Sequence, residues 1–273
     1  MSTVGYTVRP PAVAGTFYPE SRADLEETVA GFLAAARAAS PEGARRAPKA
    51  VIAPHAGYVY SGPIAASAFT ALAGSSGRAA AIRKVVLLGP AHRVPVRGLA
   101  LPEAMGFATP LGVVEIDPEM ARAASRLPQV RLQPEAHAPE HSLEVELPFL
   151  QVLLGDFKFL PLVVGDAGGE EVAEVLEAVW GDEETVVVIS SDLSHYLPYD
   201  TAHRVDRETA DAILRLEGPI DPRRACGAYP INGLLVAARR RGLVPELLDL
   251  RNSGDTAGDR RQVVGYGAFA FHA

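Results

Sequence analysis

The sequence predicts an α/β protein with a mostly parallel or mixed central sheet and helices on both faces. Three short aliphatic runs support this, at residues 50–53, 84–88 and 186–189. Each is as continuously apolar as a strand that is covered on both faces, and each ends in a loop with polar residues. The 273 residues are expected to form a single domain, residues 1–273.

Composition restricts the class of protein. The chain is 48% hydrophobic and 22% charged, as is ordinary for a globular protein. Its net charge is -7 and its basic runs, Arg45–Arg46 and Arg239–Arg241, are short and isolated, which argues against a nucleic acid partner. A lone cysteine excludes an internal disulfide framework. We see no signal peptide and no apolar run long enough to span a membrane, so we expect a cytoplasmic protein without membrane contact.

Helix and strand signals alternate along the first half of the chain. Ser21 opens a helix in which Leu25 and Val29 share one face. Small residues after Pro63 predict another helix, since proline is tolerated in a first turn. The expected order is a helix from 21, a polar connection at 37–47, a strand at 50–53, a helix at 63–73, a strand at 84–88 and a hairpin-like excursion at 98–117.

The second half continues this alternation. Asp117 and Pro118 start a short helix. Residues 139–155 are expected to form one helix with a kink at Pro148, because proline cannot donate to the carbonyl four residues back. The remaining expected elements are strands at 157–165 and 186–189, helices at 168–181 and 199–216, a helix from 230, and final strands at 245–254 and 262–273.

Three histidines follow apolar strands by a few residues. His55, His92 and His195 each lie among Gly, Pro or Ser, where no local packing requires an imidazole. Parallel strands open a crevice at their carboxyl ends, so these side chains are expected to converge on a ligand site. The other histidines, except His141, are expected to be structural or solvated.

Two neutral imidazoles on separate strands are a reasonable start for a transition-metal site. Cys226 is the best candidate for a third ligand, because it lies just before a helix start that favours the thiolate. The alternative is a small buried apolar residue, as free cysteine often is.

Other polar residues suit supporting roles. Asp192 can orient the ring of His195 and make it a general base near neutral pH, or it can simply cap the turn. His141 and Glu144 are three residues apart at an expected helix start, so they can touch each other. They either support the ligands from behind or contribute only helix-end electrostatics.

Six motifs occur along the chain in the order AGTFYP, APHAGYVYSG, LLGPAHRVP, EHSLEVELPFLQ, ISSDLSHY and CGAYPINGLL. In these motifs and their order the chain resembles the MEMO family, called AmmeMemoRadiSam system protein B in prokaryotes. The resemblance covers nearly the whole chain. That family is similar in fold to the class III extradiol (LigB-type) dioxygenases, which hold non-haem Fe(II) with two His and one Glu. The resemblance therefore implies the same α/β fold and a metal pocket.

The resemblance also implies roles for individual residues. His55 and His92 match the metal-binding histidines, and His195 matches the acid/base position. Cys226 stands where the dioxygenases have glutamate. Fe(II) is the ion that the resemblance implies first. A thiolate is a softer ligand than a carboxylate, so Zn and Cu are alternatives. Phe17 and Tyr60 match positions of a pocket reported to accept phosphotyrosine-type peptides. Radical SAM and AMMECR-type proteins are the implied partners.

Three functions stay open at this point. The first is a metal-dependent oxidoreductase with an unknown small molecule or peptide as substrate. The second is a non-catalytic protein that keeps the pocket to bind a metal or a peptide, acting with those partners. The third is a metal hydrolase, since a metal-activated water needs no redox chemistry.

Overall fold

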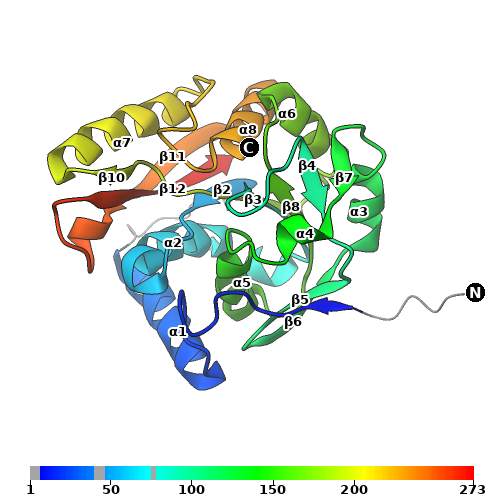
Figure 1. The fold of residues 1–273 in the computed structure, drawn as a ribbon, viewed down its shortest axis with the longest axis horizontal. Helices are drawn as coiled ribbons and strands as arrows, with labels where there is room; N and C mark the ends of the chain where they lie inside the picture. Colours follow the sequence, from blue (N-terminus) through cyan, green and yellow to red (C-terminus); the bar gives the residue numbers. More distant parts are fainter. Residues whose placement is uncertain (1–6, 40–46, 75–77) are drawn as a thin grey trace, which may run out of the picture.

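A computed structural model describes residues 7–39, 47–74 and 78–273 of the chain. It confirms the predicted α/β class, with one mixed sheet between two layers of helices (Figure 1). Most of the predicted polar connection at 37–47, with the Arg45–Arg46 pair, lies outside the described residues.

Four parallel strands form the centre of the sheet. They are β2 (Ala50–Ala53), β9 (Thr185–Ser190), β3 (Lys84–Pro90) and β8 (Lys158–Val164), adjacent in that spatial order. Ala50 to Ala53 pair with Val187 to Ser190, so both strands end at the same level. The carboxyl ends of all four therefore meet at one edge of the sheet.

Shorter and antiparallel strands extend the sheet on both sides. On one side β12 (Val263–His272) pairs antiparallel with β2, β11 (Val244–Asn252) and β10 (His195–Leu197). On the other side β6 (Gly112–Ile116) joins β8 and forms the predicted hairpin with β5 (Gly106–Thr109). The remaining strands are β1 (Val8–Arg9) on β5, and β4 (Leu99–Leu101) with β7 (Val130–Leu132) beside β8.

Alternate residues of the central strands face two separate cores. Val51 and Val85 pack in one core with helices α1 (Arg22–Ala39), α2 (Tyr58–Ala73) and α5 (Leu147–Leu154). Ile52 and Leu88 pack in the other with α3 (Pro118–Ala124), α6 (Gly169–Ala178), α7 (Tyr199–Leu214) and α8 (Ala228–Arg241). Figure 1 shows the first group of helices below the sheet and α6, α7 and α8 above it. Burial on both faces explains why these strands are continuously apolar.

The expected kinked helix at 139–155 is wrong. A short helix α4 (Pro134–His137) comes first, and a 3-10 turn at Glu144–Glu146 precedes α5, which starts at Leu147. Glu140 explains the late start, because its carboxylate accepts the backbone N–H groups of His141 and Ser142, both at 2.9 Å. A side chain that captures these N–H groups competes with the first turn of a helix.

Two further 3-10 turns, Arg78–Ala81 and Ser253–Asp255, complete the regular structure of the described residues. None of the helices within the described residues is both long and apolar enough to cross a membrane.

Leu88 provides a test of the sheet core, because it is fully buried at the centre of the second core. We expect Leu88→Ala to lower the free energy of unfolding by about 2–5 kcal/mol, the sum of lost burial and a residual cavity. Urea unfolding of both proteins measures this. Leu132→Ala is the matched control. Leu132 is 64% exposed, so its substitution should lower the free energy of unfolding by no more than about 0.5 kcal/mol. Equal costs at the two sites would contradict this packing.

Candidate metal centre

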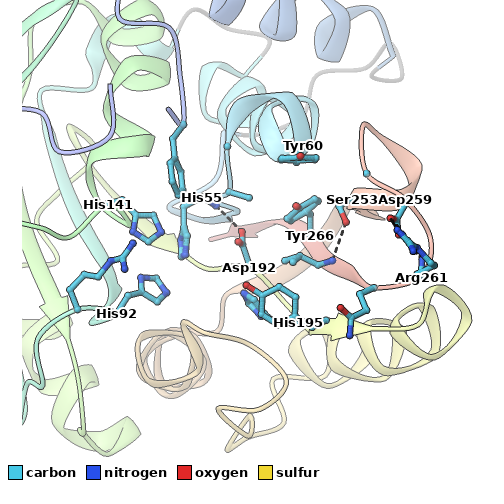
Figure 2. A pocket seen from close by; sticks show the side chains of 18 residues that line it. His55, Tyr60, His92, His141, Asp192, His195, Ser253, Asp259, Arg261 and Tyr266 are labelled. Carbon is cyan, nitrogen blue, oxygen red and sulfur yellow. Dashed lines mark hydrogen bonds and ion pairs between the residues drawn. The ribbon is translucent and has the colours of Figure 1, made fainter. Parts of the chain in front are cut away.

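A pocket of about 990 Å³ opens at the carboxyl edge of the central strands. Figure 2 shows His55, His92 and His141 close together at one end, and Tyr60, Asp259 and Arg261 at the other. Asp192 and His195 lie between these two ends. The strand-end histidines and Asp192 thus reach one cavity, as predicted from their positions in the sequence.

Three histidines form a group that could hold a metal ion. One ring nitrogen from each of His55, His92 and His141 lies within 4.8 Å of the others. The rings also contact one another, with centroids 5.2 Å apart for His55 and His92 and 4.7 Å apart for His92 and His141. Imidazole nitrogens at this spacing are suitable ligands for Zn, Cu, Fe or Ni.

His55 is held in place where β2 ends. Its backbone N–H donates to Asp192 Oδ1 at 2.9 Å, which ties the end of β2 to the loop after β9. Burial, and then the neighbouring His92 and His141, lowers the pKa of His55 well below its ordinary value. The ring is therefore neutral at pH 7, as a metal ligand has to be.

His92 is oriented by the carboxylate of Glu140. The two Glu140 oxygens accept from the His92 backbone N–H at 2.6 Å and from its ring Nδ1 at 2.9 Å. Burial alone would raise the pKa of Glu140, but these bonds and the backbone N–H groups outweigh it and lower the pKa to about 2. An ionised Glu140 requires a proton on His92 Nδ1, so Nε2 carries the free lone pair. A carboxylate behind a histidine is the usual support of a histidine ligand.

His141 is the residue that the sequence assigned only a supporting role. It does not follow a strand; Glu140 and Ser142 fix its loop, with Ser142 Oγ donating to the Pro90 carbonyl at 2.9 Å. Gly89 permits this approach, because an added Cβ would lie 2.8 Å from Ser142 Oγ. Burial lowers the pKa of His141 to about 4.

One nitrogen of this ring lacks a hydrogen bond. His141 Nδ1 is buried and has no hydrogen-bond partner among the described residues, although Glu140 Oε1 lies 3.4 Å away. A buried neutral ring with a spare nitrogen beside two other histidines fits a metal ligand.

Glu144 does not form the expected contact with His141. It is fully buried and accepts from Arg9 Nη1 at 2.6 Å, Tyr18 Oη at 2.6 Å and the backbone N–H groups of residues 12 and 13. These bonds fasten the amino-terminal loop, whose Phe17 ring packs on His141 with centroids 4.7 Å apart. Glu144 thus supports the site through this loop. Phe17 and Tyr60 both line the pocket, and their predicted role in substrate binding stays a prediction.

Cys226 lies against His55 rather than in the three-histidine group. Its Sγ is 3.4 Å from His55 Nε2 and accepts from the Asp192 backbone N–H at 3.3 Å. Burial, and then the charge of Asp192, raises the pKa of the thiol, so the expected stabilisation of a thiolate by the start of α8 is outweighed. A bound cation can reverse this. Cys226 is therefore near enough to complete a ligand set, and its role as a ligand stays a prediction.

Asp192 and His195 are placed differently from the expected pair. His195 Nδ1 bonds to the Leu193 carbonyl at 2.8 Å, while Asp192 is engaged with the backbone of His55. The expectation that Asp192 orients His195 is wrong, because the backbone carbonyl does so. Burial raises the pKa of Asp192 to about 7 and lowers the pKa of His195. The next residue, Tyr196, has φ +58°, a strained conformation for a side chain of this size.

Comparison with known proteins agrees with this architecture. A family described as Memo-like protein matches residues 9–270. A MEMO1 family protein of Aquifex aeolicus is 37% identical over 95% of this chain and 97% of its own length. Relatives of the same description from Methanothermobacter thermautotrophicus and Methanopyrus kandleri are 36% and 38% identical over 95% and 96% of this chain and 98% of their own lengths. Matches that span both chains almost completely leave one conclusion: the chain belongs to the Memo-like family.

Proposed function

We propose that this protein binds a divalent transition metal in the pocket and acts as a metal-dependent oxidoreductase on a small organic molecule. The observation that carries the proposal is the convergence of His55, His92 and His141, with an ionised carboxylate behind one ring. Neutral imidazoles held by such partners are suited to ligation before any ion arrives. Cys226 would join the set once its proton leaves.

Fe(II) is the ion that we propose, with Zn or Cu as alternatives. Imidazole accommodates all three, and the nearby thiol favours the softer ones. When bound, Fe(II) would supply Lewis acidity and one-electron chemistry. The donor set fits such an ion because His55 and His141 are neutral and His141 has a spare buried nitrogen.

His195 would move protons. Because its Nδ1 side faces the Leu193 carbonyl, the proton lies on Nδ1 and Nε2 is free to accept one. Burial lowers its pKa, which keeps the base form populated at pH 7. Asp192, with a pKa of about 7, can hold or release a second proton in the same cavity.

The charges of the pocket favour an anionic substrate. Arg93 lines the cavity beside the histidines and has no ion pair among the described residues, whereas Arg261 is already paired with Asp259 at 2.8 Å. Bound metal would add to the positive potential. An organic acid or phosphate is attracted by this arrangement.

Two other functions keep some support. Three histidines beside a free base would also serve a metal hydrolase, because a metal-bound water needs only a proton acceptor. A non-catalytic protein that works with radical SAM and AMMECR-type partners would need the metal or the pocket but not the base. Anaerobic purification with elemental analysis, then oxygen consumption with ascorbate as reductant, separates a redox enzyme from both.

The first test of this proposal is metal binding. We expect one divalent ion per chain, with His55→Ala, His92→Ala, His141→Ala and Cys226→Ser each weakening Fe(II) or Zn(II) affinity by about tenfold or more. Competition with a chromophoric chelator measures this. His203→Ala is the matched control, since that ring is 45% exposed and pairs with Asp255. Full affinity in all four variants would contradict the site.

The pH dependence of affinity tests Cys226 separately. The pKa values of His55 and His141 are lowered, so between about pH 6 and 8 these rings have no proton to lose. The pKa of Cys226 is raised, so its ligation must release a proton and affinity should rise with pH by up to about tenfold per unit. The contribution of the thiol should be missing from Cys226→Ser, so its slope should be shallower than that of the wild-type protein. Parallel curves for the two proteins would leave only the histidines as ligands.

His195→Ala distinguishes an enzyme from a binding protein. We expect unchanged metal content and oxygen consumption lowered by about a hundredfold, the usual contribution of a positioned base. Elemental analysis and an oxygen electrode, with ascorbate as reductant, provide the two readouts. Loss of metal would instead make His195 a ligand, and unchanged consumption would exclude its role as the base.

A further inference from the structure

A serine and a glutamate behind His55 take no part in the site described so far. Ser190 is the last residue of β9 and is fully buried. Glu146 ends the 3-10 turn before α5, and it is also fully buried. Both side chains lie on the side of His55 that faces away from Cys226, because His55 contacts Ser190 through Nδ1 and Cys226 through Nε2.

Ser190 Oγ has three polar neighbours. His55 Nδ1 lies at 2.7 Å, the Ser142 carbonyl oxygen at 2.6 Å and Glu146 Oε1 at 2.8 Å. A hydroxyl group has one proton to donate and two lone pairs to accept with. The three neighbours therefore compete for one proton, and the outcome decides which nitrogen of His55 is protonated.

His55 does not receive the Ser190 proton. The Ser142 carbonyl can only accept, so it requires the Ser190 proton. If Glu146 is ionised, it is a second and stronger acceptor on the same side. If Glu146 is neutral, it donates to the Ser190 oxygen while Ser190 donates to Ser142. In both cases the contact between Ser190 Oγ and His55 is a hydrogen bond only if His55 donates from Nδ1.

The neutral form of Glu146 suits its surroundings. Its Oε2 atom is buried without a hydrogen-bond partner among the described residues, and no cation there pairs with it. Burial raises its pKa well above the ordinary value, with a further contribution from Asp192. A neutral Glu146 leaves the Ser190 proton with the Ser142 carbonyl, and each of the three polar atoms that contact Ser190 Oγ is then paired.

We propose that Ser190, whose hydroxyl is held by the Ser142 carbonyl and Glu146, is a positioning residue that keeps His55 in the tautomer with its proton on Nδ1, so that the Nε2 lone pair faces the pocket. The contact on the other side agrees, because the Cys226 thiol at 3.4 Å can donate to a free Nε2. This inference rests on the proposed function only in treating His55 as a ligand. The tautomer itself is a property of the metal-free protein.

Nitrogen-15 NMR of histidine-labelled, metal-free protein tests the tautomer directly. We expect the wild-type His55 ring to be protonated on Nδ1 and unprotonated on Nε2. Assignment comes from the signals that disappear in His55→Gln. A wild-type ring protonated on Nε2 would overturn the proposal without the need for any further variant.

Variants then test which residues set the tautomer. Ser190→Ala removes the acceptor, so we expect a mixture of tautomers and Zn(II) affinity lowered by about tenfold or more. Glu146→Gln can still donate to Ser190 Oγ, and in Glu146→Leu the Ser142 carbonyl still takes the Ser190 proton, so both variants should keep the wild-type tautomer. Thr209→Val removes a buried hydroxyl that donates to the Val205 carbonyl, and it controls for general destabilisation.

The outcomes separate the two claims. If the wild-type protein binds neither Zn(II) nor Fe(II), the proposed function fails, while the NMR result still decides the tautomer. If Ser190→Ala keeps the wild-type tautomer and affinity, the positioning role of Ser190 is wrong although the metal site stands. A Glu146→Leu variant with His55 protonated on Nε2 would also contradict the hydrogen-bond argument.

Discussion

Parallel pairing of β2, β9, β3 and β8 is the constraint on which the other features depend. Because these strands run in one direction, each delivers the residues after its last hydrogen bond to the same edge. His55, His92 and Asp192 are neighbours for this reason alone, although 137 residues separate the first from the last. The antiparallel strand β12 adds β10 and His195 to the same region.

Two buried carboxylates hold the loops of the site that the strands do not position. Glu140 joins the end of β3 to the loop of His141, and Glu144 joins that segment to the amino-terminal loop. Each carboxylate is paired with several N–H or O–H donors, which offsets the cost of removing its charge from water. Together they hold residues 138–143, which form no helix or strand, in place beside the pocket.

The part of the site that could be predicted from the sequence is the part that depends on local pattern. A buried strand and the polar residue that follows it are adjacent in the chain, so His55, His92 and His195 could be named from periodicity. His141 could not, because its position depends on long-range bonds from Ser142 to Pro90 and from Ser190 to Ser142. A signal was nevertheless present: the polar residues of EHSLEVE stand in an otherwise apolar segment. The partners of Asp192 and the proton affinity of Cys226 depend on burial, which no local pattern shows.

The position of β2 in the sheet has a consequence for how the protein is made. β2 lies between β9 and β12, which are synthesised more than a hundred residues later. Until β9 has been made, β2 has no neighbouring strand in the sheet and His55 lacks its contacts with Ser190 and Asp192; such non-local pairings form late and slowly. A nascent chain that has not reached β9 therefore lacks the contacts that orient His55, so the group of three histidines is assembled only in the second half of synthesis.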